Sequence, residues 1–131
     1  MLTLDGAIVS RATLPRAPLA ILFVTTFDVP SQLAAKRLAD VSVKMGCGAL
    51  GIVLEPPENR ILAEAFGRAL HLPYPLAMAD AEILRGGGPF GGVVGVPTLL
   101  ILDRRGRIAY RSEGLPSSQQ IANAFGFAAR R

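Results

Sequence analysis

Short, uninterrupted apolar runs alternate along the chain with longer segments whose apolar residues recur at helical spacing. Residues 19–24 and 49–54 contain no charged side chain, so we predict two buried strands. The continuous apolarity of residues 19–24 favours a central, parallel position. A third run, residues 99–102, leads through the turn 103–106 into the alternating residues 107–111, and this pattern predicts an antiparallel hairpin.

Three longer segments show the spacing of a helix with one apolar face. The first begins at Asp28, a favourable N-cap, tolerates Pro30 in its first turn and ends at Gly46 or Gly48. The second follows Asn59, which we predict to be its N-cap. Its predicted buried face consists of Ile61, Leu62, Ala65, Phe66, Ala69 and Leu70. The third covers residues 116–127, with Ile121, Ala124 and Phe125 pointing inward.

Shorter elements complete the predicted fold. Residues 2–10 form an N-terminal β-hairpin, residues 76–78 a short extended segment, and residues 80–84 one helical turn. The order of elements predicts an α/β protein, with a central mixed β-sheet flanked by helices on both faces. The chain has 131 residues and no internal repeat, so we expect a single domain over residues 1–131.

Charge narrows the possible partners only slightly. Fourteen basic residues outnumber ten acidic ones, which gives a net charge of +4, and all basic residues except Lys36 and Lys44 are arginines. Aromatic residues do not interleave a basic stripe, so we expect no nucleic-acid partner. The densest basic cluster on the predicted hairpin consists of Arg104, Arg105, Arg107 and Arg111. This cluster is either a weak anion-binding patch or a charged edge that prevents strand pairing.

The single cysteine, Cys47, excludes an intramolecular disulfide. With His71 as the only histidine, the spacing typical of metal ligands is missing, and we expect no metal and no other cofactor. The longest apolar run, residues 17–24, is too short to span a bilayer. A signal peptide is not visible, so we expect a cytoplasmic protein, or a periplasmic one if a leader has been removed.

The segment around Pro97 carries a resemblance to a known family. Val96-Pro97-Thr98 precedes an apolar strand, an Asp-x-x-Gly turn and a second strand, after which Glu113-Gly114 follows. This arrangement resembles the C-terminal half of the thioredoxin superfamily, and most closely the TlpA/ResA-like thiol–disulfide proteins and their AhpC/TSA-type peroxiredoxin relatives. The resemblance implies a thioredoxin-like fold in which the Val96–Pro97 bond is cis and Pro97 faces the active-site helix.

The same resemblance places the redox centre of the family at the start of the first helix. The family pattern there is an aromatic residue, Cys, two residues and Cys, with Pro common before the second Cys. Here the frame reads Phe27-Asp28-Val29-Pro30-Ser31, so Asp28 and Ser31 replace both cysteines. Thiol–disulfide exchange needs an attacking thiolate and a resolving thiol. The resemblance therefore implies the fold and argues against the activity, while Asp28 keeps a negative charge that the Ser31 N–H can bind.

Four other positions bear on catalysis. The acidic residue that some relatives carry three positions after the second Cys is Ala34 here, and the buried Asp of thioredoxins corresponds to Leu22. Glu55, at the carboxyl end of a predicted strand, either lines the cleft or is a solvated loop carboxylate. Ser31 acting as a nucleophile would need a neighbouring base, and His71, at the far end of the second helix, is not expected to reach it.

We therefore predict a redox-inactive thioredoxin-like module that binds a protein or peptide partner in a groove. The predicted groove consists of Phe27, Asp28, Val29, Pro30, Ser31, Val96, Pro97 and Thr98. Nearby Phe90 and Val94 are also apolar, which favours such a partner over a charged metabolite. Two alternatives stay open: a structural part of a larger assembly, and a thiol–disulfide oxidoreductase or peroxidase that uses Cys47 with an external thiol. Cys47 follows the first helix, whereas the peroxidatic cysteine of related peroxidases starts it.

Overall fold

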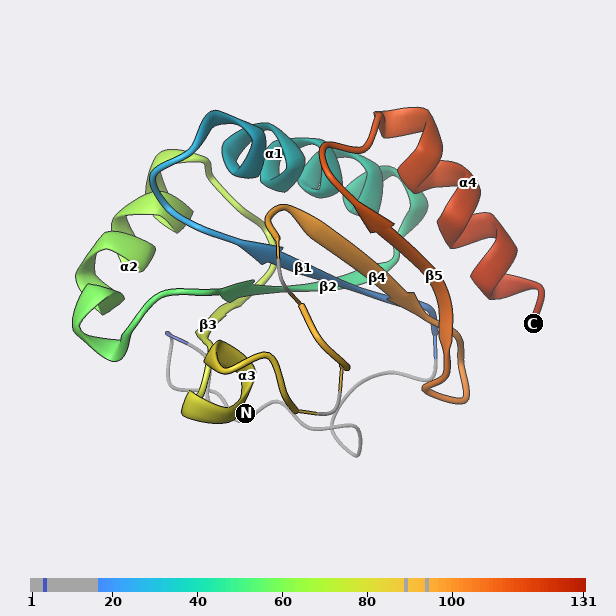
Figure 1. The fold of residues 1–131 in the computed structure, drawn as a ribbon. Coiled ribbons are helices and arrows are strands. Elements are labelled where there is room, and N and C mark those ends of the chain that lie inside the picture. Colours follow the sequence, from blue (N-terminus) through green and yellow to red (C-terminus); the bar gives the residue numbers. More distant parts are fainter. Residues whose placement is uncertain (1–3, 5–16, 89, 94) are drawn as a thin grey trace.

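A five-stranded mixed sheet forms the centre of the part of the chain that the computed structural model describes, namely residues 4, 17–88, 90–93 and 95–131 (Figure 1). The strands are β1 (Leu19–Val24), β2 (Gly48–Val53), β3 (Leu76–Met78), β4 (Thr98–Leu102) and β5 (Ile108–Glu113). Their order in the sheet is β3-β2-β1-β4-β5. β1 pairs parallel with β2 and antiparallel with β4, which confirms its predicted central position. The hairpin predicted for residues 2–10 lies outside the described residues.

Helices cover both faces of the sheet, as the element order predicts. They are α1 (Val29–Met45), α2 (Arg60–Ala69), α3 (Ala81–Leu84) and α4 (Ser118–Ala129), with a 3₁₀ turn, η1 (Pro57–Asn59), before α2. α1 and α4 lie side by side over one face, and the short α3 lies against the other (Figure 1). No helix within the described part of the chain is both long and apolar enough to cross a bilayer.

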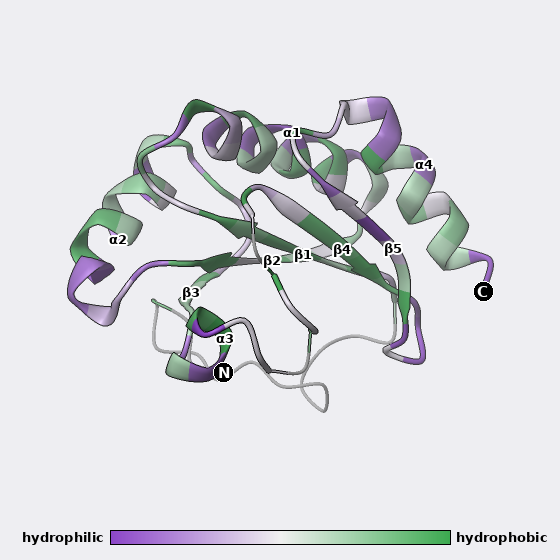
Figure 2. Ribbon diagram, viewed as in Figure 1, coloured by the Kyte–Doolittle hydropathy of each residue, from purple (hydrophilic) through white to green (hydrophobic). Residues whose placement is uncertain are grey.

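The unbroken apolarity of β1 follows from burial on both of its faces. Ala20, Leu22 and Val24 belong to the core beneath α1 and α4, and the alternate residues, such as Phe23, belong to the core on the α3 side. Phe23 is fully buried. The hydrophobic colour of the central strands contrasts with the polar outer turns (Figure 2). Burial of each large apolar side chain contributes about 1.5–3 kcal/mol to folding.

The two ends of α1 match the sequence prediction. Asp28 has extended backbone angles, and its side chain accepts a hydrogen bond from the Ser31 N–H, which is the geometry of an N-cap. At the other end Gly46 adopts φ 65°, a left-handed conformation that glycine tolerates, and its N–H bonds the carbonyls of Ser42 and Val43. The Asp28 cap and the left-handed Gly46 therefore define where the helix begins and ends.

The predictions for α2 were wrong in two respects. The side chain of Asn59 makes no capping bond and donates instead to Glu55 Oε1 at 2.7 Å. The predicted buried face is also wrong, because Ile61 is 75% and Leu62 is 55% exposed. Ala65 and Ala69 are exposed too, and only Ala63 and Phe66 of this helix are buried. The reason is that α2 packs beside β3, at the edge of the sheet, so only a narrow stripe of the helix is covered.

Candidate functional site

The candidate site lies where β1 ends and α1 begins. Residues 25–28 form the turn between them, at the carboxyl end of the central strand. Thr98 pairs with Phe23 in the sheet, so the segment that enters β4 arrives beside the same end of β1. The Val96–Pro97 peptide bond in this segment is cis. The topology therefore brings the two segments of the predicted groove to one end of the sheet.

Three side chains close a hydrogen-bond network at the start of α1. The Ser31 N–H donates to Asp28 Oδ1 at 2.7 Å, and the Thr25 hydroxyl donates to Asp28 Oδ2. The Thr25 N–H in turn donates to the Ser31 hydroxyl oxygen at 3.2 Å. Ser31 is fully buried, so its hydroxyl fixes the turn from inside. The network therefore holds a carboxylate and a buried hydroxyl in a fixed arrangement at the start of α1.

The Asp28 carboxylate is held in its charged form. Partial burial raises its pKa, but hydrogen bonds from Thr25 and from the backbone and side chain of Ser31 outweigh this and set the pKa below the ordinary value. The amino end of a helix also favours a negative charge. Asp28 is thus a fixed anion at neutral pH, unable to form a covalent bond to sulfur.

The predicted groove residues divide into exposed and buried ones. Phe27 is 77% and Val29 is 64% exposed, and Pro30 beside them is exposed as well. The exposed side chains of the predicted groove are therefore mainly apolar.

The other residues of the predicted groove are less accessible. Pro97 and Thr98 are buried, and the Thr98 hydroxyl donates to the Gly95 carbonyl at 2.7 Å. Val96 and Asp28 are half-buried.

Sequence reasoning missed a neighbouring surface on α2. A shallow groove of about 310 Å³ adjoins the turn and is lined by Thr26, Gln32, Leu62, Ala65, Phe66, Ala69 and Leu70. Its apolar residues have a helical periodicity in the sequence, which predicts them to form the buried face of the helix. Leu62, Ala65 and Ala69 are instead exposed, and they extend the apolar surface beside the turn onto α2.

Glu55 is neither a solvated loop carboxylate nor a residue that lines the cleft, so both predictions for it were wrong. Glu55 is only 3% exposed. It accepts hydrogen bonds from the Thr26 N–H at 2.6 Å, the Thr26 hydroxyl at 3.1 Å and the Asn59 amide at 2.7 Å. The carboxylate therefore ties the turn after β1 to the segment that starts α2, and it supports the site from behind.

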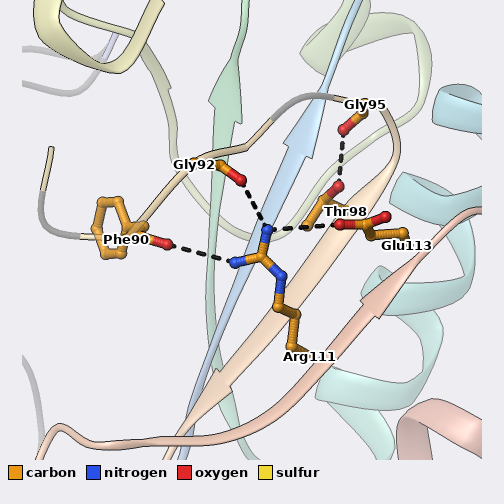
Figure 3. Close-up of polar contacts among 6 residues, drawn as sticks. All are labelled: Phe90, Gly92, Gly95, Thr98, Arg111 and Glu113. Carbon is orange, nitrogen blue, oxygen red and sulfur yellow. Dashed lines mark hydrogen bonds and ion pairs between the residues drawn. The ribbon is translucent and has the colours of Figure 1, made fainter. Parts of the chain in front are cut away.

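Arg111 fastens the loop that leads to Pro97 (Figure 3). From the edge strand β5 its guanidinium donates to the carbonyls of Gly92 at 2.9 Å and Phe90 at 3.4 Å, and it pairs with Glu113 at 3.5 Å. The Phe90 ring packs edge-on against Phe23, with centroids 5.6 Å apart. Arg111 thus differs from the other arginines of the hairpin, since it is committed to positioning this loop.

The single thiol lies away from the site. Cys47 directly precedes Gly48, which pairs with Leu19 at the opposite end of β1. It is half-buried, and burial raises the pKa of its thiol, which disfavours the thiolate. His71 lines a surface groove with Lys36 and other residues farther along α1, so the structure does not bring it to Ser31. The described residues also contain no group of three or more potential metal ligands.

Comparison with known proteins identifies the fold. The sequence matches no protein-family model and no curated protein. The structure is similar to a thiol:disulfide interchange protein of the thioredoxin family from Chlorobium tepidum, with a TM-score of 0.84 at 22% identity, over 98% of this chain and 91% of that one. A DsbF homologue from Corynebacterium diphtheriae gives 0.79 at 19% identity, over 95% and 80%.

A third similar structure is a thio-disulfide isomerase from Thermus thermophilus, with a TM-score of 0.78 at 19% identity, over 97% of this chain and 89% of that one. At these identities the likeness establishes the fold alone. The chain has a thioredoxin-like fold, and the similar structures include thiol–disulfide proteins, whereas this sequence holds one cysteine.

Proposed function

We propose that this protein is a redox-inactive thioredoxin-like module that binds an apolar, extended segment of a partner protein. The observation that carries the proposal is the closed network of Thr25, Asp28 and Ser31 at the start of α1. It occupies the position at which a Cys-x-x-Cys pair would react. The fold is kept, while the groups that would transfer electrons are replaced by groups that fix the turn.

The chemistry of disulfide exchange supports this proposal. A thiolate must attack sulfur, and a second thiol must resolve the mixed disulfide. The two positions that carry proton-handling groups in the family are occupied by Leu22 and Ala34 here. Both side chains are apolar and are buried in the core beneath α1. Cys47, the only thiol, has a raised pKa and no second cysteine to resolve an intermediate.

The chemistry of the exposed residues supports the choice of partner. Phe27, Val29 and Leu33 are 77%, 64% and 42% exposed around the start of α1, and the shallow groove beside α2 continues this apolar surface. Exposed apolar patches of this kind mark interaction sites. An extended segment with apolar side chains fits such a surface better than a charged metabolite does.

A turnover assay tests the absence of redox activity. The wild-type protein and Cys47→Ser are compared for dithiothreitol-dependent insulin reduction and for hydrogen peroxide reduction. We expect both proteins to match the rate without protein. Turnover by the wild type that disappears in Cys47→Ser would overturn the proposal and assign a thiol-based enzyme.

A peptide array tests the binding surface. The wild type is probed on immobilised extended peptides that differ in apolar content, next to Phe27→Ser/Val29→Ser and a control, Val43→Ser/Met45→Ser. The control residues are 66% and 43% exposed at the other end of α1. We expect the wild type to bind apolar peptides more tightly than polar ones. The affinity for apolar peptides is expected to fall by about tenfold or more in Phe27→Ser/Val29→Ser and to stay unchanged in the control. Absence of peptide binding, or equal loss in both variants, would contradict this surface.

A further inference from the structure

Five arginines gather at the end of the molecule opposite the candidate site. We call this surface the basic end, and it consists of Arg104, Arg105, Arg107, Arg130 and Arg131. The β4–β5 turn and the end of α4 meet there, because Arg104 donates to the Ala129 carbonyl at 3.2 Å and Arg131 pairs with Asp103 at 4.0 Å. All five arginines are exposed. The two polar segments lie at the same side of the molecule in Figure 2.

The positive charge of the described residues is concentrated at this basic end. Against its five arginines stands one acidic side chain, Asp103, which also accepts the Arg105 and Arg107 N–H groups at 2.9 and 3.0 Å. The remaining described residues hold seven basic and eight acidic side chains, so they carry almost no net charge. The molecule therefore has a strongly polarised charge distribution, which orients it in the field of an anionic surface.

Apolar side chains accompany the arginines. Ile108, next to Arg107, and Phe127, one turn before Arg131, are each 45% exposed. The Arg131 guanidinium lies 5.6 Å from the centre of the Phe127 ring. Arginines combined with exposed aromatic and aliphatic side chains are typical of surfaces that enter the headgroup region of a bilayer, where the charges meet phosphates and the apolar groups reach the acyl boundary.

The register of the sheet places the basic end and the candidate site at opposite ends of β1. Leu102, just before the β4–β5 turn, pairs with Leu19 at the start of β1, while Thr98 pairs with Phe23 near its end. A flat anionic surface that contacts the basic end would therefore leave Phe27 and Val29 facing solution. Both surfaces can be occupied at the same time.

We propose that the basic end docks the protein peripherally on an anionic lipid bilayer. Each arginine near such a surface strengthens binding by about fivefold, and five together suffice for reversible attachment. The aliphatic side chain of Ile108 cannot stack on a nucleobase. Phe127 is the only aromatic side chain among the exposed large hydrophobic residues of this end. These features favour lipid over a nucleic acid.

Vesicle co-sedimentation tests the proposal. The probes are vesicles of pure phosphatidylcholine and vesicles that also contain phosphatidylglycerol, at about 0.1 M salt. We expect the wild type to sediment only with the anionic vesicles and to be released as salt rises. Arg105→Glu/Arg107→Glu is expected to weaken binding by about 25-fold or more. Phe127→Ser, which leaves the charge intact, is expected to weaken it severalfold.

A matched variant separates the contribution of the basic end from the effect of the total charge of the protein. Arg68→Glu/Arg85→Glu makes the same change in total charge at two exposed arginines outside the basic end, and its binding is expected to stay within about threefold of wild type, since distant charges are screened. Circular dichroism checks that all variants are folded. Equal losses in the two double variants, or no binding to anionic vesicles, would overturn the proposal. Binding to an oligonucleotide without binding to vesicles would overturn it as well.

Discussion

At the scale of single residues, the start of α1 is fixed by the Asp28 carboxylate and the buried Ser31 hydroxyl. Asp28 supplies the anion that a helix N-terminus favours, and its bond to the Ser31 N–H at 2.7 Å is the one that the sequence predicts. The part played by Thr25 was not predictable. A hydroxyl three residues upstream can equally well face solvent, and only the fold of the turn directs it to Asp28.

Loss of this cap tests the role of Asp28 in stability. Asp28→Ala is expected to lower the free energy of unfolding by about 1 kcal/mol at neutral pH, because it removes the acceptor of the Ser31 N–H. Asp40→Ala, at an exposed position of the same helix, is expected to change it by less than about 0.5 kcal/mol. Urea unfolding of both variants makes the measurement, and equal effects would contradict the capping role.

The pH dependence of this difference has a definite sign. The pKa of Asp28 is lower in the folded protein than its ordinary value of 3.8. Its ionised form therefore contributes stability that is fully present above the ordinary value and is lost as pH falls through the folded pKa. The gap between wild type and Asp28→Ala is expected to narrow below about pH 4. A gap that widens on acidification would contradict the shift.

Glu55 shows why a sequence can identify a residue and misassign its surroundings. Its place after a buried strand suggested a loop carboxylate, yet Thr26 and Asn59 supply three donors and bury it. Those donors come from positions 29 residues upstream and 4 residues downstream. The upstream contact depends on the parallel alignment of β1 and β2, which a local pattern does not contain.

Removal of this carboxylate leaves buried donors without an acceptor. Glu55→Ala is expected to lower the free energy of unfolding by about 2–3 kcal/mol, because the Thr26 N–H and the Asn59 amide lose their partner. Glu58→Ala, at an exposed position of η1, serves as the control and is expected to have little effect. Denaturant unfolding of the two variants distinguishes a supporting role from a solvated carboxylate, for which both effects would be small.

At the scale of elements, periodicity predicted which segments are strands and helices better than it predicted what covers them. β1 and α1 were predicted closely because burial on both faces and good caps leave clear local signals. For α2 the same periodicity predicted a buried face that is mostly exposed in the structure. A helix at the edge of a sheet is covered only along a stripe, and Ala63 and Phe66 fill it. Sequence alone does not say how wide the covering layer is.

The loop before Pro97 offers a test at this scale. Arg111→Ala removes the donors to the Phe90 and Gly92 carbonyls, so the loop is expected to open more often. Chymotrypsin should then cleave after Phe90 severalfold faster than in the wild type. Arg107→Ala, just before β5 begins, is the control and is expected to leave the rate unchanged. An unchanged rate in Arg111→Ala would show that the packing of Phe90 on Phe23 is sufficient.

At the scale of the whole molecule, the described sheet and helices form a thioredoxin-like fold in a chain with one cysteine. The apolar strands and the helices predict a mixed sheet flanked by helices, and the resemblance around Pro97 implies that the fold is thioredoxin-like; none of these features depends on cysteine. What the sequence could not give was the arrangement of charge, because the arginines at residues 104–107 and those at the end of α4 come together only in the folded chain. The result is a molecule with an apolar site at one end and a basic surface at the other.

We propose that Asp28 and Ser31 stand where two sulfur atoms would form a disulfide in a Cys-x-x-Cys pair. The most direct measurement is the mass of Asp28→Cys/Ser31→Cys, made in a Cys47→Ser background, after mild oxidation and again after reduction. We predict a loss of about two mass units on oxidation, reversed by dithiothreitol, because one helical turn brings the two side chains within bonding reach. Asp28→Cys alone, in the same background, serves as the control. Two thiols that stay unpaired under oxidising conditions would contradict the account.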